Sequence, residues 1–161
     1  MATNTLIQYL EAVDSSGTAY STATSNRRQV ETFIAAEGIV AKDAVSLDLS
    51  QAADGTKALK IVKAIIGTTT ARCFIGVALN SASTGKNVDV VVQGICEANV
   101  DGATAAGSIL QIGATGGRLG VRTVAVDEGG AATFNLYPVA GISSEADTGN
   151  IATICVFKQG I

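Results

Sequence analysis

The stretch that decides the fold class runs from residue 88 to residue 100 and reads Val88-Asp89-Val90-Val91-Val92-Gln93-Gly94-Ile95-Cys96-Glu97-Ala98-Asn99-Val100. From Val88 onward every second residue is apolar or glycine, while the residues between them are mostly polar. A period of two is typical of a β-strand that turns one face to a core. The stretch therefore predicts one long strand, and Gly94 predicts a bulge or bend within it.

Short strands and tight turns are predicted on both sides of the long strand. Residues 75–79 form an apolar run, and residues 80–87 carry the Asn, Ser and Gly that favour turns, so together they predict a β-hairpin with the long strand. The chain holds 18 Gly and a single Pro, as expected where many turns need a positive φ. Further turns are predicted at 101–102, 113–117 and 128–130, with strands at 121–126 and 131–137.

Composition sets the size and the core of the domain. A chain of 161 residues is long enough to bury a sizeable core without disulfides or metals. Aromatic residues make up only 4% and Trp is absent, so the core must consist of Val, Ile, Leu and Ala. We therefore predict a mainly β fold of short antiparallel strands with at most one or two short helices.

The start of the chain differs from the rest. Residues 1–28 are rich in Ser, Thr and Asn and predict an extended polar arm, while residues 29–161 predict a single β-barrel-like domain. The domain begins with a predicted strand at 29–35, where apolar and polar residues alternate. A helix is the open alternative for these seven residues.

The two halves of the chain carry a weak internal repeat at a spacing of about 64 residues. Gly76-Val77-Ala78 is echoed by Gly141-Ile142-Ser143, and residues 82–85 are echoed by residues 146–149. Our hypothesis is that both halves contribute related hairpins to one barrel, because neither half covers its apolar face alone. The hypothesis requires that the halves share one strand order; otherwise the repeat is accidental.

Charge and chain pattern exclude two classes of partner. The net charge is −3 and the pI is near 4.8, which opposes nucleic-acid binding because phosphate contacts need clustered Lys and Arg. The first residues lack a basic region followed by an apolar run, and no apolar stretch is long enough to span a bilayer. We therefore expect synthesis in the cytoplasm, with neither nucleic acid nor membrane as a partner.

Residue content also argues against an enzyme. Histidine is absent, which rules out Ser-His-Asp and Cys-His nucleophiles and zinc sites with imidazole ligands. Cys73, Cys96 and Cys155 stand far apart among apolar neighbours and predict buried free thiols, with a three-thiolate site as the alternative. We predict no catalytic residue, no metal and no cofactor, and Ser-Lys chemistry is the only enzymatic route left open.

The remaining motifs favour structural explanations. Asp127 and Glu128 precede two glycines and predict a hydrated hairpin tip. Asp43 and Asp48 lack the dense run of Asp, Asn and Gly that is usual for calcium, so a structural cation between them is the weaker interpretation. The Gly-rich stretch 113–120 lacks the GK[ST] ending of a phosphate loop and predicts a turn.

An ordered series of small and aliphatic blocks covers about residues 38–157. The blocks are Gly76-Val77-Ala78-Leu79, the turn at Gly85, the run 88–94, Ala105-Ala106-Gly107, Arg118-Leu119, Gly141-Ile142, Ala146-Asp147, Gly149-Asn150 and Ile154. This order resembles the small decoration, or cement, proteins of tailed bacteriophages. The resemblance implies a β-barrel or β-tulip core and a homotrimer at threefold or quasi-threefold positions of a coat with the HK97-type fold. The long polar start departs from the shortest members of that family, which leaves the contacts of residues 1–28 open.

The resemblance implies a structural virion protein that binds the outer surface of the phage capsid and stabilises the shell. Its partners would be the major capsid protein and further copies of itself, and its location the capsid exterior after synthesis in the host cytoplasm. We predict capsid contacts at Arg27, Arg28, Val30, Phe33 and Ile34, where the arm meets the first strand. The alternatives are a tail, tube or baseplate component, and a non-enzymatic carbohydrate-binding β module.

Overall fold

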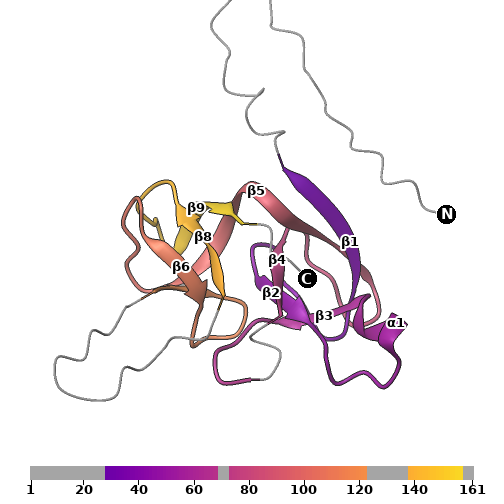
Figure 1. The fold of residues 1–161 in the computed structure, drawn as a ribbon. Coiled ribbons are helices and arrows are strands. Elements are labelled where there is room, and N and C mark those ends of the chain that lie inside the picture. The colour runs from indigo at the N-terminus through magenta and orange to yellow at the C-terminus, as the bar shows by residue number, and fades with distance from the viewer. Residues whose placement is uncertain (1–27, 69–72, 123–137, 158–161) are drawn as a thin grey trace, which may run out of the picture.

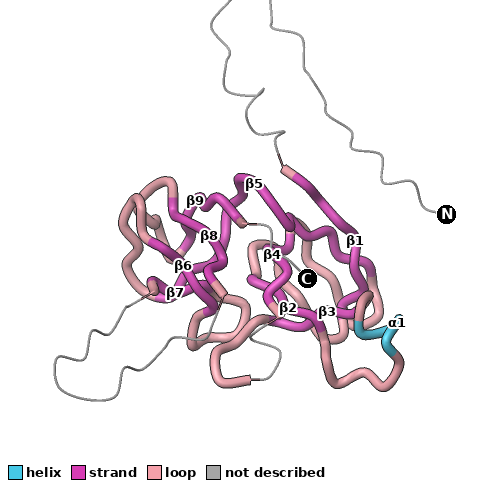
Figure 2. The backbone as a smooth tube through the Cα atoms, in the orientation of Figure 1, coloured by secondary structure: helices cyan, strands magenta, loops and turns pink. Residues whose placement is uncertain are grey.

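The structure is a computed structural model that describes residues 28–68, 73–122 and 138–157. These residues form nine strands and one short helix (Figures 1 and 2), which confirms the predicted mainly β fold. Residues 1–27, the predicted strand 131–137 and most of the predicted strand 121–126 lie outside the described residues. The elements are β1 Gln29–Ala35, β2 Ala44–Leu47, α1 Asp54–Lys57, β3 Lys60–Lys63, β4 Phe74–Ala78, β5 Asn87–Asp101, β6 Ile109–Ile112, β7 Leu119–Val121, β8 Val139–Ser143 and β9 Ile151–Val156.

Five strands close into a first barrel. The pairing order is β1-β3-β2-β4-β5, and β5 pairs back to β1, so the ring has no missing neighbour. The β1–β3 pair is parallel, and the other four pairs are antiparallel. Side chains that alternate along these strands fill the interior, as the period-two pattern predicted. The core of this barrel consists of Phe33, Ala35, Ile39, Val45, Ile61, Ile75, Ala78, Ala82, Val88, Val90 and Val92.

The long strand β5 belongs to two barrels. Its residues before Gly94 pair with β1 and β4, whereas Gly94 and the residues up to Asn99 pair with β9. Gly94 has a φ of 109°, a conformation that glycine adopts without strain, so the bend predicted there is confirmed. The last two residues of β5 pair with β7, and the ring β5-β7-β6-β8-β9 closes because β9 pairs back to β5. Figure 1 shows this second barrel in orange and yellow beside the first, with β5 running through both.

The two barrels have the same strand order. In each barrel, with its strands counted in chain order, the first strand pairs in parallel with the third and antiparallel with the fifth. The second strand lies between the third and the fourth and pairs with both. The internal repeat is therefore confirmed, but the hypothesis of one barrel built from both halves is wrong. Strand β5 has 15 residues, enough to be the last strand of one ring and the first strand of the next.

The barrels also repeat an irregularity and a glycine contact. The second and fourth strands shift register after Val45 in the first barrel and after Leu110 in the second. The residues opposite are Gly76 and Gly141. A Cβ atom at either glycine would overlap a backbone carbonyl oxygen of the adjacent strand, that of Val91 or Cys155 respectively. Both positions therefore require glycine for the same reason, close approach of two backbones.

The end of the second barrel packs against the side of the first. In the connection between β6 and β7, the carbonyl of Gly117 accepts a hydrogen bond from the amide of Ala44 at 2.7 Å. The amide of Gly117 donates to the carbonyl of Ala64 at 2.9 Å. Strand β4 is consequently buried on both faces. The core of the second barrel includes five residues from the outside of the first, namely Ala44, Ala64, Phe74, Val77 and Val91.

Candidate functional site

The predicted capsid-contact residues occupy different environments. Arg27 lies outside the described residues, and Arg28 is exposed immediately before β1. Val30 is 41% exposed on the outer face of β1, and Ile34 is half-buried. Phe33 points into the first barrel and is 8% exposed, so it fixes β1 to the core rather than offering surface. The structure therefore leaves Arg28 and Val30 as the accessible members of the set.

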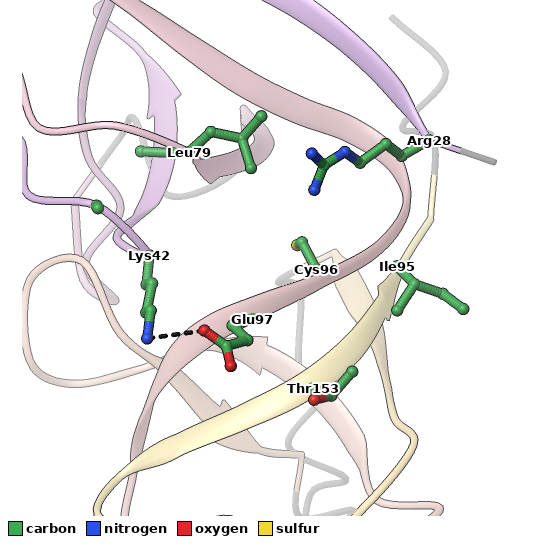
Figure 3. A pocket seen from close by; sticks show the side chains of 9 residues that line it. Arg28, Lys42, Leu79, Ile95, Cys96, Glu97 and Thr153 are labelled. Carbon is green, nitrogen blue, oxygen red and sulfur yellow. Dashed lines mark ion pairs between the residues drawn. The ribbon is translucent and has the colours of Figure 1, made fainter. Parts of the chain in front are cut away.

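A cavity of about 340 Å³ lies where β5 passes from one barrel to the other (Figure 3). The first barrel contributes the residues before β2 and the end of β4, and the second contributes β5 and β9. The cavity is open to solvent, and Arg28 reaches over it from the start of β1 in Figure 3. Its lining residues are Arg28, Ala41, Lys42, Ala78, Leu79, Ile95, Cys96, Glu97 and Thr153.

One ion pair crosses the cavity. Lys42 Nζ lies 2.7 Å from a carboxylate oxygen of Glu97, and the side chains are 36% and 57% exposed. Because water screens a pair of this exposure, it contributes between zero and about 1 kcal/mol to stability. The Glu97 charge is thus matched by Lys42. Among the described residues that line the cavity, Arg28 is then the cation that can meet an acidic side chain of a partner.

The cavity is poorly suited to covalent chemistry. Its nucleophile, the Cys96 thiol, is buried, and this burial raises the pKa of Cys96 to about 12 from an ordinary value of 9.0. The positive charge of Arg28 acts in the opposite direction but does not offset the burial. Because the thiolate is the reactive form, Cys96 is inert near neutral pH. The thiol that lines this cavity is therefore not an activated nucleophile.

The two aspartates considered for a cation are held by separate loops. Asp43 accepts hydrogen bonds from the Val40 amide at 2.9 Å and from Asn99 Nδ2 at 3.0 Å. Asp48 accepts bonds from Ser50 and Gln51. Burial of Asp48 raises its pKa, but these hydrogen bonds outweigh the burial and leave the pKa below its ordinary value. Among the described residues no group of three or more acidic or Cys side chains is placed to hold a metal.

A row of apolar side chains crosses the outside of each barrel. The first apolar row runs over β1, β5, β4 and β2 and consists of Val30, Val91, Val77 and Ala44. The second apolar row runs over β5, β9, β8 and β6 and consists of Ile95, Cys155, Ile142 and Ile109. Neighbours within each row are paired directly across adjacent strands, so their side chains share one face of the sheet. Each member of the second row follows its counterpart by about 65 residues.

The exposure of the two rows differs. In the first row Val91, Val77 and Ala44 are each 0% exposed, because the second barrel covers them. In the second row Ile95, Ile142 and Ile109 are 46%, 36% and 47% exposed, and Cys155 is half-buried. Apolar side chains gathered on one exposed face are typical of an interaction surface.

Sequence reasoning missed the second apolar row. Its clearest signal was Ile95, an apolar residue at one of the mostly polar alternate positions of the long strand. The repeat also placed Ile142 at the position of Val77. What the sequence left undetermined was which strands lie side by side, and therefore that Ile142 and Ile109 line up with Ile95.

Comparisons with known proteins identify a likeness of fold. The chain is similar to the solved structure of the head fiber gp8.5 N base in bacteriophage phi29, with a TM-score of 0.50. The two sequences are 15% identical over an alignment that covers 83% of this chain and 98% of that chain. No family model and no curated protein matches the sequence. Of the helices in the described residues, none is long and apolar enough to cross a membrane.

Proposed function

We propose that this chain is a structural protein of a tailed-phage virion, which binds the outer surface of the capsid and stabilises the shell. The observation that carries the proposal is the fold likeness to a phage head fiber base over most of both chains. The chemistry of the molecule supports it, because the cavity between the barrels offers charged binding groups and its thiol is not activated. The finer role is that of a decoration protein, a homotrimer at threefold or quasi-threefold positions, with the major capsid protein as its partner.

Shell binding by a trimer needs surface and symmetry rather than reactive groups. Three modest contacts joined in one assembly bind far more tightly than one contact, because each later contact forms at high effective concentration. A protein that binds only the assembled coat stabilises that state by mass action. In this proposal Arg28 and Val30 contact the coat, together with Arg27 and the rest of residues 1–28.

The edge of β1 supports a contact at this end of the molecule. Among the described residues β3 pairs with β1 only at Ile34 and Ala35, so residues 29–33 have β5 as their described partner on one side. An extended segment of a partner adds readily to such an edge through backbone hydrogen bonds. Val30 is exposed beside this edge, as a side-chain anchor requires.

The test is to mix the purified protein with undecorated capsids and, separately, with unassembled coat protein, and to follow co-sedimentation. Saturable binding to shells alone is the expected result. A protein that binds no shell but assembles by itself into rings or helices overturns the proposal in favour of a tail or tube component. Binding to a glycan array without shell binding overturns it in favour of a carbohydrate-binding module.

Two variants locate the contact. Arg28→Glu reverses the charge beside the cavity, and we expect it to weaken shell binding by about tenfold, equivalent to 1.4 kcal/mol. Lys86→Glu makes the same change in charge at an exposed position in the loop before β5 and is expected to bind like the parent protein. Equal binding by both variants would remove Arg28 from the proposed contact. If the protein without residues 1–28 binds shells as well as the parent does, the arm is not part of the proposed contact.

A further inference from the structure

The second apolar row is exposed at positions where the first apolar row is covered. Three of the four residues of the first row, Val91, Val77 and Ala44, are buried by the end of the second barrel, whose β6–β7 connection binds the backbone of Ala44 and Ala64. The second row has the same strand register, and Ile142 and Ile109 are larger than their fully buried counterparts Val77 and Ala44, yet they are 36% and 47% exposed. The described residues form two closed rings, and neither ring places a strand over the second row.

We propose that a second copy of this chain covers the second apolar row of Ile95, Cys155, Ile142 and Ile109. Within one molecule, the end of one barrel already recognises the outer side of its neighbour, and the same fold carries the same kind of end and side. The contact that holds the two barrels together thus continues from one molecule to the next. The inference rests on the proposed function for its biological role and deepens it by naming the face through which copies associate.

The repeat also indicates which part of the second copy takes this place. At the end of the second barrel, the β6–β7 connection binds the backbone beside the first row, at Ala44 and Ala64, and its equivalent in the first barrel is the β2–β3 connection. That connection carries two exposed apolar side chains, Leu49 at 39% and Leu59 at 52%. Association is therefore head to tail, with the β2–β3 connection of one copy on the second apolar row of the next. A head-to-tail contact forms a closed ring when its rotation permits, and a ring of three fits the symmetry of the proposed shell position.

The first experiment compares oligomeric state by sedimentation equilibrium over a wide range of protein concentration. The double variant Ile109→Glu with Ile142→Glu places charge in the second row at positions that lie outside the core. We expect it to raise the dissociation constant for self-association by at least about 100-fold. The control is Val40→Glu, which alters an equally exposed apolar residue, 54% exposed in the first barrel, and is expected to associate like the parent. A parent protein that is monomeric throughout, or a double variant that associates like the parent, overturns the proposal.

The second experiment needs no variant and so is independent of any folding defect. Cys155 lies in the middle of the second row and is half-buried in the single chain. The rate of its alkylation by iodoacetamide, measured by peptide mass spectrometry, should fall at least about tenfold between dilute and concentrated protein, as association buries the thiol. A labelling rate that does not change with concentration while the protein associates overturns the assignment of this face.

A third variant tests the head-to-tail arrangement. Leu49→Glu with Leu59→Glu should weaken association as much as the second-row variant, since the two surfaces meet. Association that survives this change but not the second-row change overturns the head-to-tail part of the proposal. The capsid assay separates the inference from the proposed function. A monomer that binds shells overturns the inference and the trimer but leaves capsid binding standing, whereas a second-row oligomer that binds no shell overturns the proposed function and leaves the inference standing.

Discussion

The two barrels share one architecture but differ in how far the same outer face is exposed. Both have five strands in the same order, a register shift at the same place and a glycine pressed against the neighbouring backbone. On the same outer face, however, Val77 of the first barrel is fully buried and Ile142 of the second is 36% exposed. The comparison teaches that strand order and register set the shape of a barrel, while the neighbour of the barrel decides which of its outer side chains are core.

The largest effect on stability is expected at the two equivalent glycines, Gly76 and Gly141. Gly76→Ala and Gly141→Ala each force a methyl group into a backbone carbonyl, and β-sheet backbone cannot move away without losing its pairing. We expect each variant to lower the free energy of unfolding by about 4 kcal/mol or more, or to prevent folding. Gly38→Ala, where nothing lies within 4 Å of the new Cβ, is the matched control. Urea unfolding followed by circular dichroism measures the effect, and tolerance at one glycine alone would mean that the barrels are not packed alike.

A second prediction concerns the thiol of Cys96, which lines the cavity between the two barrels. The pKa of Cys96 is raised to about 12, so the folded state keeps this proton at pH values where the unfolded chain has lost it. Its contribution to stability is therefore complete below pH 9 and is lost as pH rises from about 9 to about 12. The fall should reach a few kcal/mol, and Cys96→Ala should remove it.

The measurement is the free energy of unfolding of the parent and the variant at several pH values above 9. Cys155→Ala is the control, since it removes a thiol that is only half-buried in the second apolar row, and it should keep the fall. If the free energy of unfolding of Cys96→Ala falls above pH 9 as much as that of the parent, the thiol of Cys96 is in contact with water.

The third and smallest effect compares the two rows directly. Val77→Ala leaves a cavity in a fully buried position, so we expect a loss of about 2 kcal/mol. Ile142→Ala removes more atoms, but from an exposed position, and should change stability by no more than about 0.5 kcal/mol. Denaturant midpoints at low protein concentration measure the monomer, where a contact between copies contributes least. Equal losses would mean that something covers the second row within a single chain.

The sequence by itself determined the local structure. The alternation at residues 88–100 and at 29–35 predicted strands, and the structure confirms both as β5 and β1. The pattern carries this information because successive strand residues face opposite sides, whatever the strand pairs with. The glycine-rich composition predicted many turns, and the spacing of about 64 residues predicted related halves, since two copies of one fold require the same small residues at the same places.

The tertiary structure alone decided how the halves are joined and what they expose. Sequence reasoning placed both halves in one barrel, because a repeat does not say whether its units share a ring or form two. The structure shows two rings, because β5 pairs with β1 before Gly94 and with β9 from Gly94 onward. These pairings join residues that are far apart in the chain. Val91 and Cys155 likewise hold matching places in the repeat, and only the packing of one barrel on the other makes the first fully buried and leaves the second half-buried. Burial depends on neighbours in space, and a residue's own sequence context does not contain them.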